Sequence, residues 1–363
     1  MTQIRLLAVG DISLETNDRV DLFTDIQPVL NDKDILFGNL ETTLSSRGTP
    51  AEKTTVLCAC PGKAAQLCEA GFDVLSVANN HITDRGPEGA VETLEVLRRN
   101  GILPVGASSV GLTEGYAIIE RNGLKCGFAG YTEGFFPHRG RDIQVNSIDR
   151  ERILADVDML KSQCAIVVIS LHWGLENVLY PSADQIRLAR ELIDAGATLV
   201  LGHHPHVIQG VERWKQGLIA YSLGSFQFDC THVGLVSPNA RQSLVLSVTL
   251  RAGCVEDFDI VPIRVNKDNT PCLAEGQHKE EIVDLLNHIS EPIKAGRVTK
   301  PWWLEQVASY HLQGNMRAWI LRIRKYGAKH LFACIRWLVS PFTVRCYMGL
   351  ARRQAKRLWK TVC

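Results

Sequence analysis

Short apolar runs and amphipathic stretches alternate along the first two hundred residues of the chain. The apolar runs end at glycine or polar turns, which is typical of strands buried on both faces. They predict strands over residues 4–9, 34–37, 73–77, 102–105, 164–171 and 198–201. Helical spacing between them predicts helices over residues 19–30, 61–70, 84–99, 149–163 and 182–195. This alternation predicts an α/β fold in which much of the sheet is parallel.

The later part of the chain is richer in strands. Residues 116–120 and 124–131 flank an Asn122-Gly123 turn and predict a hairpin. Further strands are predicted over residues 218–222, 242–250 and 257–264. The element order suits two sheets packed together with helices outside, followed by a separable helical segment over residues 282–363.

Polar side chains of metal-binding type follow five of the predicted strands. They are Asp11; Asn39 and Glu41; Asn80 and His81; His172; and His204 and His206. Because each follows an apolar run, we expect these side chains on one edge of the sheet system. Carboxylates, amide oxygens and imidazoles together are what a binuclear hydrolytic site uses.

The segment Leu199–Val207 carries the strongest of these signals. We expect a strand to end at Gly202, where the backbone turns sharply and releases the imidazoles of His204 and His206. Neutral imidazole is the commonest protein ligand for transition metals. His203 is predicted to have a structural or supporting role.

A two-metal interpretation assigns a role to each group. Glu41 bridges two cations about 3.5–4 Å apart, and the pair lowers the pKa of bound water. His81, next to Asn80, is the candidate that protonates the leaving group, with Asp84 and Glu176 as further catalytic candidates. Asn39 and Arg19 are the predicted substrate-binding residues.

Plainer interpretations stand beside these roles. Asp11 and Asn80 are also common turn residues, and His172 fits a satisfied buried histidine. Asp84 is at least as well explained as the N-cap of its helix, with Ser182 as the corresponding cap of a later helix. Arg19 and Glu176 fit solvated surface charges equally well.

Charge divides the chain unevenly. Residues 315–363 contain 12 Lys and Arg and no Asp or Glu, which leaves 28 Lys and Arg against 39 Asp and Glu in residues 1–314. The basic segment interleaves tryptophan, leucine and isoleucine with arginine, which is typical of a helix lying on an anionic membrane surface. A helical pair packed on the acidic body is an equal alternative. Nucleic-acid binding is not expected, because no nucleic-acid-binding module accompanies the charge.

Cysteine usage and the N-terminus bear on location. The eleven cysteines include no Cys-x-x-Cys pair, which argues against structural zinc and fits a reducing compartment. The first predicted strand begins at Ile4 with no room for a signal peptide, and no apolar run reaches transmembrane length. We therefore expect a cytoplasmic protein, with a peripheral position at the inner face of the membrane if the basic segment binds lipid.

The ordered motifs resemble those of the CapA/PgsA poly-γ-glutamate capsule biosynthesis family, within the calcineurin-like metallophosphoesterase superfamily. The motifs are Gly10-Asp11, Asn39-Leu40-Glu41, Ala78-Asn79-Asn80-His81, His172-Trp173-Gly174, Gly202-His203-His204-Pro205-His206 and Tyr221-Ser222-Leu223-Gly224-Ser225-Phe226. The resemblance implies a four-layer α/β/β/α sandwich over roughly residues 4–264. Ser13 and Glu41 stand where the broad superfamily has histidine and aspartate, and this leaves the first metal with fewer ligands.

The resemblance also implies a division of the ligands. Asp11 and His206 would hold one metal, and Asn80, His172 and His204 the other, with Glu41 bridging and His81 as the general acid. The metals would be manganese, iron or zinc. The substrate would be an ester or amide bearing anionic charge, such as a poly-γ-glutamate chain or another surface-polymer precursor.

These observations predict a metal-dependent hydrolase-like protein of capsule or surface-polymer biosynthesis. The predicted organisation is a metallophosphatase-like domain over residues 1–275, a helical linker region over 276–314 and a basic amphipathic helical tail over 315–363. A non-catalytic scaffold of a polymer-assembly complex and a phosphoesterase unrelated to capsule are the alternatives.

Overall fold

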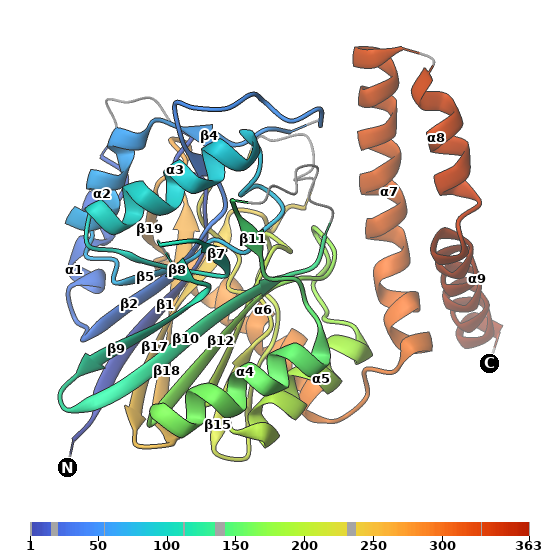
Figure 1. Cartoon of the computed structure of the whole chain (residues 1–363). Helices are drawn as coiled ribbons and strands as arrows, with labels where there is room; N and C mark the ends of the chain where they lie inside the picture. The colour runs from blue at the N-terminus through green and yellow to red at the C-terminus, as the bar shows by residue number, and fades with distance from the viewer. Residues whose placement is uncertain are drawn as a thin grey trace.

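A mixed sheet carries the first half of the sandwich in the computed structural model, which describes residues 2–15, 21–53, 55–111, 113–134, 142–230, 237–327 and 329–362 (Figure 1). Its strand order is β19-β18-β17-β1-β2-β5-β6, with β16 beside β1. Its strands are β1 (Ile4–Ile12), β2 (Ile35–Leu40), β5 (Val74–Ser76), β6 (Leu103–Val105), β16 (Ser225–Gln227), β17 (Gln242–Arg251), β18 (Cys254–Val265) and β19 (Pro271–Leu273). The pairs from β1 through β2 and β5 to β6 are parallel, so their carboxyl ends share one edge.

A second sheet lies against the first and has the order β14-β15-β13-β12-β10-β9. Its strands are β9 (Tyr116–Arg121), β10 (Leu124–Thr132), β12 (Ile166–His172), β13 (Leu199–His203), β14 (Val211–Trp214) and β15 (Gly217–Ala220). The strands from β10 to β15 are parallel, and the predicted hairpin is the β9–β10 pair. Short strands complete the loops: β3 (Thr43–Leu44), β4 (Cys58–Ala59), β7 (Ala107–Ser109), β8 (Thr113–Glu114) and β11 (Gln144–Val145).

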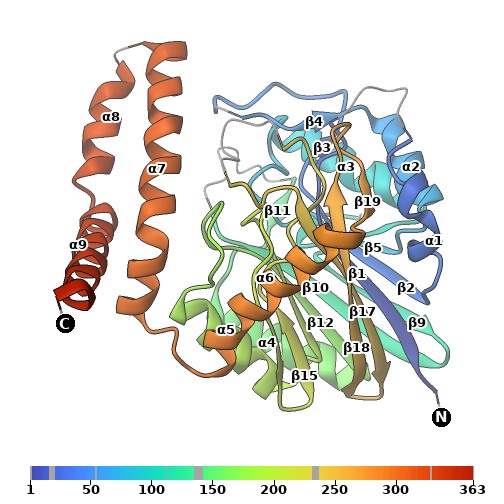
Figure 2. The same ribbon diagram turned by 180° about the vertical axis from the view of Figure 1, so that it is seen from behind.

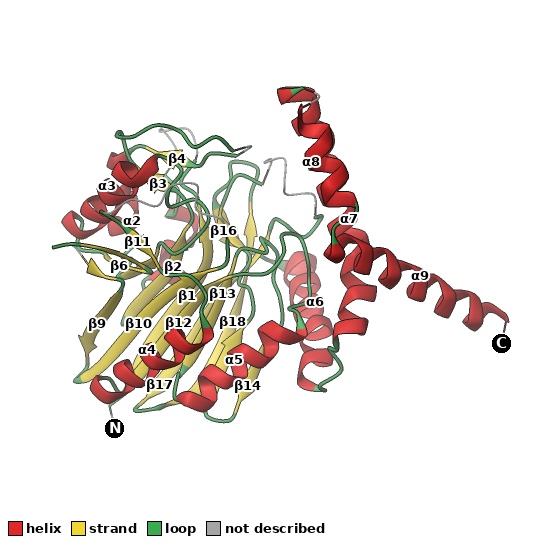
Figure 3. Ribbon diagram, turned by 45° about the vertical axis from the view of Figure 1, so that its right-hand side comes forward, coloured by secondary structure: helices red, strands yellow, loops and turns green. Residues whose placement is uncertain are grey.

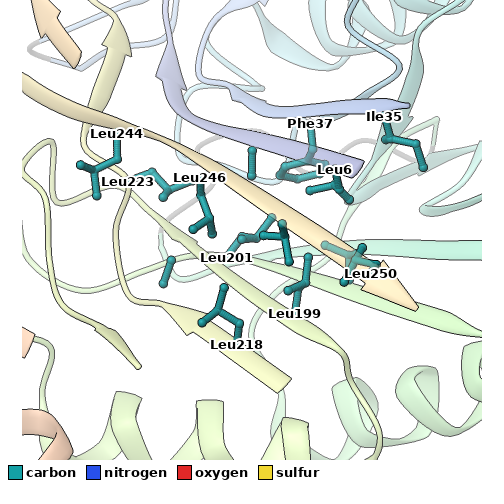
Figure 4. Close-up of a cluster of buried hydrophobic side chains, with 14 of the residues drawn as sticks. Leu6, Ile35, Phe37, Leu199, Leu201, Leu218, Leu223, Leu244, Leu246 and Leu250 are labelled. Atoms are coloured by element: carbon teal, nitrogen blue, oxygen red, sulfur yellow. The ribbon is translucent and has the colours of Figure 1, made fainter. Parts of the chain in front are cut away.

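The apolar runs are continuous because both faces of the central strands are buried. In β1, Leu6 and Ala8 point into the core between the sheets, whereas Leu7 and Val9 point into the core under the helices. Leu201 of β13 enters the same inter-sheet core from the other side, as Figure 4 shows for this cluster. A strand that is buried on both faces therefore shows a continuous apolar run, and not an alternation of apolar and polar residues.

Helices cover the outer face of each sheet. The outer core of the first sheet includes α2 (Ala64–Glu69) and α3 (Gly86–Arg99), and that of the second includes α4 (Arg150–Gln163) and α5 (Ala183–Ala195). The layers are therefore helices, sheet, sheet and helices, as Figure 1 shows. The predicted α/β/β/α sandwich is confirmed.

The prediction of one helix over residues 19–30 is wrong. The described part of that range contains the short 3-10 helix Thr24–Ile26 and α1 (Gln27–Leu30). Pro28 explains the late start, because its ring would clash with the carbonyl of residue 24 inside an α-helix and is tolerated in a first turn. The loop before it is held instead by side chains, since Gln66 accepts a hydrogen bond from the backbone N–H of Leu22.

Helix caps divide into one confirmed prediction and one wrong one. Ser182 caps α5 in a full capping box with Gln185, as predicted. Asp84 does not cap α3, because that helix starts at Gly86 behind Arg85 and has no side-chain cap. The Asp84 carboxylate is instead engaged by a histidine described below.

The C-terminal helices leave the sandwich in two steps. First, α6 (Gly276–Lys294), in the region predicted as a linker, packs on the inter-sheet core through Ile282, Leu286 and Ile289. Then α7 (Lys300–Tyr326) runs alongside the sandwich and across the domain boundary predicted at residue 315. Figures 1 and 2 show α8 (Lys329–Leu338) and α9 (Pro341–Val362) beyond α7, on its side away from the sandwich.

Figure 3 shows α9 pointing away from the sandwich, with the C-terminus at its far end. Within the described residues, no helix has both the length and the apolar character required to cross a membrane. The described cysteines all carry free thiols.

Candidate metal centre

The carboxyl ends of strands from both sheets meet at one place. In the first sheet, Asp11 of β1 lies opposite Asn39 of β2, and in the second, His172 of β12 lies opposite His203 of β13. The backbone N–H of His204 donates to Asp11 Oδ2 at 3.2 Å, which joins the two sheets at this edge. The predicted single edge is therefore a junction between two sheets.

Glycines allow close backbone contacts beneath this junction. A Cβ on Gly10 would lie 1.9 Å from the carbonyl oxygen of Gly224, and one on Gly202 would lie 1.9 Å from that of Tyr221. The prediction that the strand ends and turns at Gly202 is wrong, since β13 continues to His203. The turn occurs at His204 and His206, whose φ angles are 94° and 55°. Such left-handed conformations are costly for residues other than glycine and concentrate at functional sites.

Asp11 is fully buried and well supplied with partners. Its Oδ1 accepts a hydrogen bond from the Asn39 amide at 2.8 Å and lies 3.3 Å from His203 Nδ1. Its Oδ2 lies 3.4 Å from His206 Nδ1. Burial acts to raise the pKa of Asp11, but the nearby histidines and the Asn39 hydrogen bond outweigh it and hold the pKa below its usual value. Asp11 is therefore ionised at neutral pH.

Glu41 is equally buried but lacks these donors. Neither carboxylate oxygen has a hydrogen-bond partner among the described residues. Burial, and then the charges of Asp11 and Glu176, raise the pKa of Glu41 well above its usual value. A buried carboxylate without donors is costly, and a bound cation is the ordinary way to stabilise it.

Imidazole nitrogens surround the unpaired Oε1 of Glu41. His172 Nε2 and His206 Nε2 each lie 3.6 Å from it, and His81 Nε2 lies 3.9 Å from it. Burial lowers the pKa of His172 well below its usual value and, although Asp11 opposes it, lowers the pKa of His206 to about 4. Both rings are therefore neutral near pH 7 and can act as metal ligands.

Two asparagines orient His172. The Asn39 amide lies 3.3 Å from His172 Nδ1, and His172 Nε2 lies 2.8 Å from Asn80 Oδ1. The structure buries the side chain of Asn39, the predicted substrate-binding residue, between Asp11 and His172. The reason is its place inside β2, whereas the prediction put it on a loop after that strand.

The described residues contain two groups whose ligand atoms lie within 4.8 Å of one another. One consists of Glu41, His172 and His204, and the other of Asp11, Glu41 and His206. Glu41 belongs to both, which is the position of a bridging ligand. His203 lies in neither group and contacts Asp11 from within β13.

A second cluster lies behind His81. His81 Nδ1 lies 2.7 Å from Asp84 Oδ2, and this contact leaves His81 Nε2 facing Glu41. Burial lowers the pKa of His81, although Asp84 opposes the shift. Lys53 forms an ion pair with Asp84 and donates to the carbonyl oxygen of Asn80 at 2.8 Å. Lys53 was not predicted from the sequence, because it lies between β3 and β4, outside every predicted strand, helix and strand end.

Two predicted site residues do not join this arrangement. Arg19 lies outside the described residues. Glu176 is exposed and forms no hydrogen bond or ion pair with the centre in the described structure, although its charge acts on Glu41, His81 and His206. Its contribution is therefore a negative charge at the rim.

The family profile and the similar proteins both point to capsule synthesis proteins. The profile of the family described as "Bacterial capsule synthesis protein PGA_cap" matches residues 5–230, and the predicted resemblance is thereby confirmed. "Capsule biosynthesis protein CapA" of Bacillus anthracis is 29% identical over 273 residues, covering 72% of this chain and 65% of that protein. "PGA biosynthesis protein CapA" of Bacillus subtilis (strain 168) is 29% identical over 275 residues, with 71% of each covered. The chain thus spans slightly less than two thirds of the first relative's length.

Among solved structures, a novel phosphatase from Mycoplasma pneumoniae aligns with a TM-score of 0.48 and 14% identity. The alignment covers 73% of this chain and 95% of that one.

Proposed function

We propose that this chain, which belongs to the bacterial capsule synthesis protein family, is a metal-dependent hydrolase-like protein that acts in the biosynthesis of a capsule or poly-γ-glutamate. The names of the Bacillus relatives support the polymer part of the proposal. A single observation carries the chemical part. Glu41 is a fully buried carboxylate that has no hydrogen-bond donor among the described residues, and it is shared by two groups of metal-ligand type.

The donor set fits two divalent cations. Asp11, Glu41 and His206 would hold one, and Glu41, His172 and His204 the other, with the Asn80 amide oxygen beside His172. Mixed oxygen and imidazole ligands suit manganese, iron or zinc. Such a pair of ions supplies an activated water and neutralises charge that develops on the substrate.

The protein's own groups then control a proton. Asp84 accepts from His81 Nδ1 and fixes the ring, so that Nε2 faces the centre and can exchange a proton with a leaving group. The ammonium of Lys53 pairs with Asp84 and holds that carboxylate in place. His204 and Asn80 are partly exposed, so the substrate would approach from their side.

Metal analysis of the purified full chain, combined with hydrolysis assays, tests this proposal. We expect up to two equivalents of metal in the wild type and a clear loss of metal in His204→Ala. His288→Ala is the matched control, because His288 is an exposed histidine of α6 with no partner among the described residues. Hydrolysis of bis(p-nitrophenyl) phosphate and of poly-γ-glutamate would be measured after manganese addition.

The same experiment separates the alternatives. A wild type that retains no metal and cleaves neither compound after manganese addition would contradict the enzymatic proposal and favour a scaffold in a polymer-assembly complex. Cleavage of the phosphodiester without any action on the polymer would favour a phosphoesterase unrelated to capsule.

A further inference from the structure

Exposed apolar side chains are concentrated in the C-terminal helices. Among the described residues, 13 large hydrophobic residues are exposed, and ten of these lie between Tyr310 and Met348. Single exposed apolar residues are normal on a soluble surface, whereas a concentration of them marks an interaction site. The surface of α8 and α9 therefore needs a physical explanation.

The apolar residues of α8 form one stripe. Phe332, Ile335 and Val339 lie one, four and eight positions after Leu331, so they continue one face of the helix, with Val339 directly after its last residue. All are exposed, with Phe332 at 70% and Val339 at 68%. Cys334, on a different face, is buried. The chain thus covers one face of α8 and leaves the larger apolar face open.

The α9 helix repeats this division. Its exposed stripe is formed by Val344, Tyr347 and Met348. Its other face packs on α7 so closely that a Cβ on Gly349 would lie 2.6 Å from the carbonyl oxygen of Leu304. The exposed stripe is therefore not the face that packs on α7.

Arginines lie beside both stripes. They are the exposed Arg336 of α8 and the exposed Arg345 and Arg352 of α9, and Arg317 and Arg324 are exposed on α7. Among the described residues, no carboxylate forms an ion pair with any of them. Residues 315–363 contain 12 Lys and Arg and no Asp or Glu, so the positive charge is not neutralised within the segment.

We propose that α8 and α9 bind the anionic surface of a lipid bilayer and lie in the plane of the interface. The apolar stripes would enter the boundary between headgroups and acyl chains, and the arginines would contact lipid phosphates. The position of both helices on the side of α7 away from the sandwich leaves this surface accessible (Figures 1 and 2).

Two other occupants explain less of the surface. A soluble polyanion would pair with the arginines but leave Phe332, Ile335 and Val339 in water. A second copy of this chain would cover apolar surface but bring two strongly positive segments together, which like-charge repulsion opposes. A bilayer with anionic lipids satisfies the charge and the apolar surface at once.

Vesicle co-sedimentation of the full chain tests this proposal. We expect the wild type to pellet with vesicles of phosphatidylglycerol and phosphatidylcholine and to remain in solution with phosphatidylcholine alone. The triple variant Arg336→Gln, Arg345→Gln, Arg352→Gln should partition about 100-fold more weakly, because each basic residue contributes a factor of about five near an anionic surface. The control is Lys267→Gln, Lys279→Gln, Lys294→Gln, which removes the same charge from exposed positions outside α7 to α9 and should bind like the wild type.

A second variant tests the apolar stripe separately. Phe332→Ser, Ile335→Ser, Val339→Ser changes only exposed positions and should reduce partitioning at least about 10-fold. Val110→Ser, at a position 96% exposed on the sandwich, is its control. Far-ultraviolet circular dichroism would verify that each variant keeps the helical content of the wild type.

Several outcomes would overturn the proposal. They are equal pelleting with anionic and neutral vesicles, no pelleting with either, and anionic binding that survives the serine substitutions undiminished. Binding of soluble polyglutamate as strong as binding to anionic vesicles would instead assign the arginines to a polyanion. A concentration-dependent dimer that the serine variant abolishes would assign the stripes to a second copy.

Discussion

The candidate metal centre and the C-terminal helices both reverse the usual distribution of polar and apolar groups, in opposite directions. At the centre, the carboxylates of Asp11 and Glu41 are fully buried. Phe332 of α8 and Val339, which directly follows that helix, are largely exposed. Both arrangements cost free energy, because a buried carboxylate loses its hydration and an exposed apolar side chain contacts water. The first arrangement favours a cation inside the protein, and the second favours an apolar surface outside it.

The two regions also differ in how many elements hold them. The centre takes its side chains from strands of both sheets and from the loops that follow them, so each residue is fixed by distant parts of the chain. The exposed stripes are fixed by helical periodicity alone, on helices that pack on α7. Changes at the centre should therefore affect stability and chemistry together, whereas changes on the stripes should affect only what the surface binds.

Metal removal should give the largest effect. A metal that binds the folded state at a free concentration 1,000 times its Kd raises the free energy of unfolding by about 4 kcal/mol. We expect manganese to raise the Tm of the metal-free wild type and a chelator to reverse the gain. Glu41→Gln removes the shared carboxylate and should show little of this gain, although its metal-free form should unfold near the metal-free wild type. Calorimetry with and without manganese measures this, and an equal manganese shift in both proteins would contradict the assignment of Glu41.

A matched pair of apolar truncations should give the next largest effect. Leu201 is fully buried between the sheets and Phe332 is 70% exposed. Leu201→Ala should lower the free energy of unfolding by about 3 kcal/mol, because it leaves a cavity in a close-packed core. Phe332→Ala should change it by less than about 0.5 kcal/mol, although it removes a larger side chain. Urea denaturation of both variants without lipid measures the difference, and a large loss in Phe332→Ala would show that the stripe packs against the protein.

The His81–Asp84 pair should affect chemistry more than stability. Asp84→Asn removes the carboxylate that accepts from His81 Nδ1 and should lower hydrolysis by about 100-fold, a typical share for general acid catalysis. Metal content should remain at the wild-type value, because Asp84 is in neither ligand group. Glu88→Gln, at an exposed position in the first turn of α3, is the control. The pH profile of kcat distinguishes a lost proton donor from general disruption, since only the former changes the profile.

The sequence could predict most of the centre because parallel strands buried on both faces leave an unmistakable pattern. Each apolar run ends near the end of its strand, so Asp11, Glu41, His172 and His204 could be placed at strand ends without knowledge of the pairing. Asn39 was placed on a loop because predicted strand limits are uncertain by a few residues, which separates a buried strand position from a loop position. Lys53 could not be found, because only the tertiary structure brings its loop to Asp84.

The C-terminal region shows the opposite limit. The sequence predicted amphipathic basic helices, and helical spacing is enough for that. It could not show which face of α9 is covered, because Gly349 and Leu304 meet only when α9 folds back on α7. The helix predicted over residues 19–30 was wrong for a local reason, because Pro28 is tolerated in the first turn of a helix but not in its interior.

The ion pair between α9 and α7 should give the smallest effect. Lys356 forms an ion pair with the buried Glu305, but the lysine side chain is 66% exposed, so solvent and salt screen part of the attraction. We expect Lys356→Gln to lower the free energy of unfolding by less than about 1 kcal/mol. The more exposed pair of the sandwich joins Arg187 to Asp184, and Arg187→Gln should have a smaller effect, because both side chains of that pair are exposed. Denaturation at low and high salt checks both variants. A loss of several kcal/mol for Lys356→Gln alone would mean that charge, rather than the close packing at Gly349, holds α9 on α7.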